Sequence, residues 1–215
     1  MKKNQMVYRY ISQQALKNKK AHIILRQIAK ELNISPNTVS LALMPLVRVG
    51  ALTKYMGHFE VTNINKLLNF WAVYRNFDKD IVYSTYANLG FAEIERRMPE
   101  GIAYTCYSGY VALFGNDASD YDKVYVYATK SALNEIKRRF PQIALSERSN
   151  YKNIVVLAAD PILEEMIENH QLKKSAALIT QIYVDLWNNK DWFAYEFLKK
   201  LKKRIDDIYA KAILL

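Results

Sequence analysis

Two short amphipathic helices, a tight turn and a hairpin are predicted between residues 23 and 61, and this order most constrains the fold. Apolar residues recur every four positions at Ile24, Ile28 and Leu32. Such spacing predicts a helix over Ile23–Asn33 with one apolar stripe facing a core. Asn33 and Ile34 are expected to form the turn that follows.

The second helix has a clear start signal. Ser35 is a favoured N-cap residue, and Pro36 occupies the first helical position, where a missing N–H group costs nothing. Val39 and Leu43, four residues apart, are expected to be buried. The opposite face presents three polar side chains, Asn37, Thr38 and Ser40.

Pro45 limits the expected length of this second helix. Proline lacks a backbone donor and clashes with the preceding turn, so we expect a short helix or a kink near Met44. Leu46–Gly50 would then form a separate turn.

The stretch Leu52–Val61 predicts a short β-hairpin with Gly57 at its tip. Helix, turn, helix and hairpin in this order are typical of a winged helix-turn-helix, which binds duplex DNA. An ordinary three-helix bundle that ends in a hairpin is the alternative interpretation.

Positive charge is concentrated around the same segment. The chain has a formal net charge of +10, with 31 basic and 21 acidic residues among 215. Residues 1–65 contain ten basic and two acidic side chains, a net charge of +8, and the remaining residues carry +2. A basic patch of this kind is suited to neutralising phosphates.

The sequence therefore assigns a set of candidate DNA-binding residues. Polar side chains of the second helix would read base edges, basic side chains would contact phosphates, and the hairpin would approach the minor groove. Ser35 and the helix N-terminus would meet a phosphate. The candidates are Arg26, Lys30, Ser35, Asn37, Thr38, Ser40, Arg48, Lys54, Tyr55 and His58.

The predicted fold class is an N-terminal winged helix-turn-helix followed by a small α/β domain, a mixed sheet flanked by helices, with C-terminal helices. Domain boundaries are expected at 1–63 for the DNA-binding domain, 64–99 for a helical connector and 100–215 for the α/β domain. Within the connector we expect helices over Ile64–Tyr74 and from Asp78 to about Arg97. In the α/β domain, alternating and apolar patterns predict three strands, at Ile102–Cys106, Lys123–Ala128 and Ile154–Ala159.

Catalytic patterns are weak. Ser108-Gly109 followed by Asp120 and Asp122 resembles the metal-binding arrangement of a nucleotidyltransferase, but the strand that follows carries no carboxylate. His22, His58 and His170 are far apart in the sequence, and no Cys/His ligand spacing occurs. We therefore expect neither catalysis nor a metal or cofactor. A metal-dependent nucleotidyltransferase-like enzyme and a ligand-sensing winged-helix regulator remain as alternatives.

Several segments together resemble the AbiE-type antitoxins of type IV toxin–antitoxin systems. They are Arg26–Val39, Tyr107–Leu113, Val124–Tyr127, Gln181–Leu186 and Glu196–Leu198. The resemblance implies operator binding that represses the protein's own operon, and a C-terminal domain that counteracts a nucleotidyltransferase-type toxin. Double-stranded operator DNA and such a toxin, acting with or without direct contact, are thus the expected partners.

The sequence also bears on location. No apolar run reaches the roughly 18 residues needed to cross a bilayer. The polar, basic N-terminus lacks the pattern of a signal peptide, and the chain has a single cysteine. We expect a cytoplasmic protein that does not bind membranes.

Overall fold

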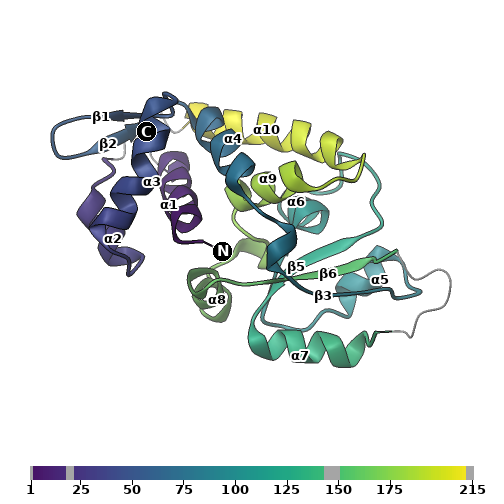
Figure 1. Ribbon diagram of the computed structural model, residues 1–215. Coiled ribbons are helices and arrows are strands. Elements are labelled where there is room, and N and C mark those ends of the chain that lie inside the picture. Colours follow the sequence, from purple (N-terminus) through teal and green to yellow (C-terminus); the bar gives the residue numbers. More distant parts are fainter. Residues whose placement is uncertain (1, 18–21, 143–150, 212–215) are drawn as a thin grey trace. The chain divides into compact units, whose positions relative to one another are not determined.

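The computed structural model describes residues 2–17, 22–142 and 151–211, and these residues form a mixed α/β structure (Figure 1). The chain divides into two compact units, each described separately below. The first unit contains the residues up to Arg75 together with those from Lys199 onward. The second unit contains Asn76–Leu198.

The first unit consists of helices around a two-stranded hairpin. Its elements are α1 (Lys3–Lys17), α2 (Leu25–Glu31), α3 (Pro36–Arg48), β1 (Leu52–Lys54), β2 (Phe59–Val61), α4 (Ile64–Tyr74) and the later part of α10 (Ala194–Lys211). The predicted hairpin is confirmed, because β1 pairs antiparallel with β2 from Leu52↔Val61 to Lys54↔Phe59. The predicted helix Ile64–Tyr74 is also confirmed, and the Asn63 side chain caps it.

Helix α3 runs through Pro45 to Arg48, so the expected short helix and the separate turn at Leu46–Gly50 are wrong. Proline at position 45 deprives the carbonyl of Leu41 of its usual helical donor. The Leu41 side chain is 67% exposed, so this carbonyl lies on the solvent side of the helix. Water can satisfy it there, which explains why the helix tolerates the proline.

The second unit is built on a four-stranded mixed sheet. The strands are β3 (Ile81–Thr85), β4 (Ile102–Thr105), β5 (Val124–Ala128) and β6 (Ile154–Ala158). Their order is β3-β6-β5-β4, in which only β5 and β6 run parallel. The helices are α5 (Phe91–Arg96), α6 (Cys106–Phe114), α7 (Lys130–Arg139), α8 (Pro161–Glu168), α9 (Ile179–Asn188) and the start of α10.

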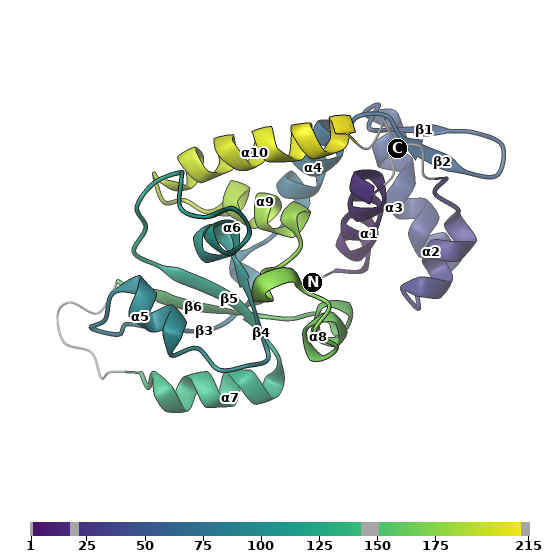
Figure 2. The same ribbon diagram turned by 180° about the vertical axis from the view of Figure 1, so that it is seen from behind.

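Helices cover both faces of this sheet. Both views show α5 and α7 on one face and α6 and α9 on the other (Figure 1, Figure 2). The predicted alternation along β5 is confirmed: Val124, Val126 and Ala128 pack on the α5 and α7 side, with Ile94 and Ile136. The sheet is therefore the middle layer of three.

The expected helix from Asp78 to about Arg97 is wrong. Asp78–Asp80 forms one short 3₁₀ turn, Ile81–Thr85 is strand β3, and α5 starts only at Phe91. Ile81, Val82 and Tyr83 are β-branched or aromatic residues that favour strands. The strand is completed by antiparallel pairing with β6, a partner that the local sequence around β3 does not indicate.

No helix in the described part of the chain is both long enough and apolar enough to cross a bilayer.

Candidate nucleic-acid interface

Helix α3 has one buried and one exposed face. Val39, Ala42, Leu43 and Leu46 are almost fully buried. The opposite face is a stripe with spacings of four, three and four residues, which lie one above another on a helix. It consists of Asn37, Leu41, Met44 and Arg48, all exposed except the half-buried Met44. We call these four residues the α3 stripe.

The N-terminus of α3 is organised by Ser35. Its hydroxyl accepts a hydrogen bond of 3.1 Å from the backbone N–H of Thr38, and the two hydroxyls are 2.8 Å apart. The predicted N-cap is confirmed, and it engages the Thr38 side chain as well. The side chain of Asn37, by contrast, is exposed and makes no hydrogen bond within the described residues. Its amide is free to bind an external partner, whereas Ser40 is half-buried.

The predicted cationic residues are on the surface. Arg26, Lys30, Arg48 and Lys54 are all exposed. None of the four forms an ion pair with another residue that the structure describes. Unpaired surface cations of this kind can contact phosphates without first breaking an internal salt bridge.

The hairpin tip exposes an apolar side chain that sequence reasoning missed. Met56 is 98% exposed, and the adjacent Gly57 has a φ of +84°, a conformation that glycine adopts without strain. On the flank, the Tyr55 ring stacks on His58 with a centroid separation of 5.1 Å. The hairpin thus presents an exposed thioether side chain at its tip and, on its flank, a Tyr55 ring that packs against His58.

Leu41 on α3 is another exposed apolar residue that the sequence analysis does not predict. Counting in helical steps from the buried Val39 and Leu43 would have placed Leu41 on the outer face, because it lies between them in the sequence. Leu41 and Met56 are 67% and 98% exposed.

Beside the hairpin lies a cluster formed by His22, His58 and Glu60. His58 and Glu60 are two residues apart at strand β2 and therefore point to the same face. Ile23 forms an antiparallel bridge with Phe59, which places His22 opposite Glu60. The two imidazole rings stack at 4.0 Å, and both Nε2 atoms face one carboxylate oxygen of Glu60, at 3.6 Å from His22 and 3.3 Å from His58.

His22 and His58 are far apart in the sequence, but the fold brings their rings together. Their proximity follows from the Ile23–Phe59 bridge. No local pattern in the sequence indicates this bridge, because its two segments come from separate parts of the chain. His170 belongs to the second unit and takes no part.

The net charges of the two structural units differ more than the net charges of residues 1–65 and of the remaining residues. The residues of the first unit include 18 basic and four acidic side chains, a net charge of +14, because the later part of α10 contributes six of the bases. The second unit has 13 basic and 17 acidic side chains, a net charge of −4. Arg9 is buried and does not belong to the cationic surface, and Lys19 and Lys20 lie outside the described residues.

The nucleotidyltransferase-like residues are not gathered into a metal site. Asp120 and Asp122 are exposed in the loop before β5, and Ser108 is buried within α6. Among the described residues, the single group of three side chains whose ligand atoms are close enough to share a metal ion is the cluster of His22, His58 and Glu60.

Two buried polar residues of α9 connect this helix to the sheet. Asp185 on α9 is completely buried and accepts hydrogen bonds from the hydroxyls of Thr105 and Tyr127, both at 2.7 Å, and from the Gln181 amide at 2.9 Å. Gln181 and Asp185 are the polar residues of the segment Gln181–Leu186. Here they connect α9 to strands β4 and β5.

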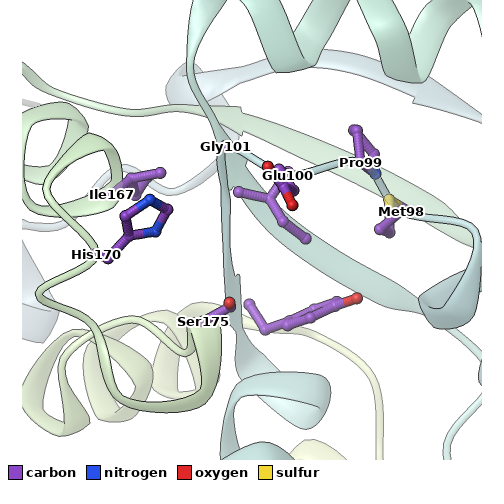
Figure 3. A pocket seen from close by; sticks show the side chains of 9 residues that line it. Met98, Pro99, Glu100, Gly101, Ile167, His170 and Ser175 are labelled. Carbon is purple, nitrogen blue, oxygen red and sulfur yellow. The ribbon is translucent and has the colours of Figure 1, made fainter.

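A pocket of about 330 Å³ lies in the second unit, beside β4 (Figure 3). His170 and Ile167 line one side, and Met98 and Pro99 of the loop before β4 line the other. Its volume is at the lower end of the roughly 300–1,000 Å³ found for small-molecule sites. An effector would bind here if the protein were a ligand-sensing regulator.

A scan against protein-family models finds no match for this chain, and searches of curated proteins and of solved structures find no significant match either.

Proposed function

We propose that this protein is a DNA-binding transcriptional regulator and that α2, α3 and the β1–β2 hairpin act as a winged helix-turn-helix. The observation that carries the proposal is the α3 stripe: a free Asn37 amide, an apolar centre and an unpaired Arg48, on a helix whose other face is buried. A helix about 10–12 Å across fits the major groove, which is about 12 Å wide.

Each part of the stripe matches a feature of the groove. Asparagine can form two hydrogen bonds to adenine, and the exposed Leu41 suits the methyl group of thymine. Arg48, together with the exposed Arg26, Lys30 and Lys54, would contact phosphates. Met56 and Tyr55 of the hairpin would approach the minor groove, where apolar side chains can wedge against base pairs.

The charge of the two units supports the same assignment. A net charge of +14 on the first unit favours a polyanion, and −4 on the second unit opposes its contact with one. The second unit is therefore available for a different partner. On the resemblance described above, we propose an AbiE-type antitoxin that represses its own operon and counteracts a nucleotidyltransferase-type toxin.

The test is a binding titration of the full-length protein with a fluorescent duplex taken from upstream of its own reading frame. Unlabelled duplex of unrelated sequence is included as competitor. We expect binding that resists the competitor and whose affinity falls with salt, with a slope of about −0.9 per phosphate contacted. Failure to bind any such duplex better than the competitor would contradict the proposal.

The antitoxin role has its own test. The chain is co-expressed with the protein encoded by the adjacent reading frame, and growth is measured with and without it. Rescue of growth from a toxic neighbour supports the role. A neighbour that is harmless, or whose toxicity this chain does not relieve, would count against it while leaving DNA binding unaffected.

A further inference from the structure

The cluster of His22, His58 and Glu60 lies beside the hairpin and is used neither by the fold's core nor by the proposed DNA contacts of α3. Its three ligand atoms lie within 4.8 Å of one another. His22 comes from the extended segment before α2, whereas His58 and Glu60 come from strand β2 and the residue before it. The cluster therefore connects two segments that are distant in the sequence.

We propose that His22, His58 and Glu60 bind a divalent transition-metal ion of the zinc class. Two imidazoles and one carboxylate form a ligand set that zinc accepts, and a fourth position would be left for water. The set contains no thiolate and only one carboxylate, so it disfavours both soft monovalent copper and the oxygen-seeking calcium and magnesium ions.

The distances suit such an ion. Donors bound to zinc at about 2.0–2.1 Å in a tetrahedral arrangement are separated by about 3.4 Å. The Glu60 oxygen lies 3.6 Å from His22 Nε2 and 3.3 Å from His58 Nε2. Both donor separations that involve Glu60 are thus close to the value for a tetrahedral zinc site, and the two imidazole donors lie within 4.8 Å of each other.

Binding requires one adjustment. The planes of the stacked imidazoles are inclined by only 28°, and the lone pair of each Nε2 lies in the plane of its own ring. They must tilt apart to converge on one ion. His22 can make this movement, because 62% of its side chain is exposed, whereas His58 is held between the rings of His22 and Tyr55.

Solvent can reach the cluster from outside. The side chains of His58 and Glu60 are 21% and 28% exposed, which leaves a path for an ion and for the water that would complete its coordination. Within the described residues, Glu60 is the one acidic side chain of the hairpin region, so the ion would bring two positive charges to a single carboxylate. The preference of the site for one metal ion over another would therefore come from its two imidazole ligands rather than from its negative charge.

The test uses the full-length protein, freed of any purification tag and of bound metal, and titrated calorimetrically with ZnCl₂. We expect saturable binding of one ion per chain. The variants His22→Ala and Glu60→Gln should each weaken binding roughly tenfold or more, whereas His170→Ala, which removes the histidine of the second unit, should bind like the wild type. His22 is exposed, so its replacement is not expected to impair folding.

Co²⁺ supplies a second readout, because its visible absorption bands report tetrahedral nitrogen and oxygen ligands. The bands should appear in the wild type and in His170→Ala, and should be lost in His22→Ala. No saturable zinc binding by the wild type, or binding that persists unchanged in both His22→Ala and Glu60→Gln, would overturn the assignment. The result does not depend on whether the protein binds DNA.

Discussion

Ile23 and Phe59 each donate a backbone hydrogen bond of 2.9 Å to the other. This reciprocal pair adds one antiparallel step to the β1–β2 hairpin and ties it to the segment that leads into α2. The direction of α2 and the position of the hairpin are therefore linked through the backbone. The same pairing sets His22 opposite Glu60.

Asn37→Ala tests base reading by α3. The substitution should cost about 1–3 kcal/mol of binding free energy on the preferred duplex and relax discrimination at one base position. Stability should not change, because the Asn37 side chain has no hydrogen bond within the described residues. Competition titrations with single-base variants of the duplex measure both effects. Wild-type discrimination in Asn37→Ala would remove this residue from the interface.

Lys54→Ala tests phosphate contact by the hairpin. Affinity should fall by a similar factor for every duplex sequence, and the salt slope should flatten by about one. The matched control is Lys79→Ala, which removes the same charge from an exposed position of the second unit. Equal effects of the two substitutions would mean that Lys54 acts through net charge alone.

Zinc should stabilise the first unit if the cluster of His22, His58 and Glu60 binds it. At a free zinc concentration of 100 times Kd, the free energy of unfolding should rise by about 2.7 kcal/mol. A thermal melt of the wild type with and without ZnCl₂, compared with Glu60→Gln, provides the measurement. Zinc that raises Tm equally in both proteins would be acting elsewhere.

Asp185→Ala should destabilise the second unit by about 3 kcal/mol, because it leaves buried hydroxyl donors on Thr105 and Tyr127 without their acceptor. Asp120→Ala, at an exposed loop position, is the control and should change stability by less than about 0.5 kcal/mol. Urea unfolding followed by tryptophan fluorescence and circular dichroism reports the difference. A small effect at Asp185 would show that water replaces the carboxylate.

Alkaline pH should destabilise the first unit through Tyr8. Burial raises the pKa of Tyr8 from 10.0 to about 12, so the phenol ionises more readily in the unfolded chain. This contribution to stability is complete below pH 10 and is lost as the pH rises towards 12. Tyr8→Phe keeps the ring that packs edge-on against Phe70 and should flatten the alkaline decline. Tyr195→Phe, at a position 66% exposed, should not flatten it.

Local patterns predicted much of the first unit. The Ile64–Tyr74 helix and the hairpin are confirmed, because their signals are short-range: a capping Asn63, regular apolar spacing and a glycine at the tip. Helix α2 is shorter than predicted, from Leu25 to Glu31, and Ile24 lies before it with 44% of its surface exposed. An apolar residue at the expected spacing is not always buried.

The rest depended on long-range pairing. The local sequence pattern predicts a helix where strand β3 forms, because the pairing partner β6 is far along the chain and does not contribute to that pattern. The His22 and His58 pair depends on the Ile23–Phe59 bridge, and the charge of α10 joins the first unit through contacts such as the 2.9 Å hydrogen bond from the Tyr209 hydroxyl to the Val61 carbonyl. None of these relationships leaves a signal within a window of ten to twenty residues.

The opposite signs of the two units have a consequence for encounter kinetics. The first unit carries +14 and the second −4, so a polyanion attracts the first unit and repels the second. Before any contact forms, the field of such a polyanion would favour approach through the first unit over approach through the second. This orientation would fade as added salt shortens the range of the field.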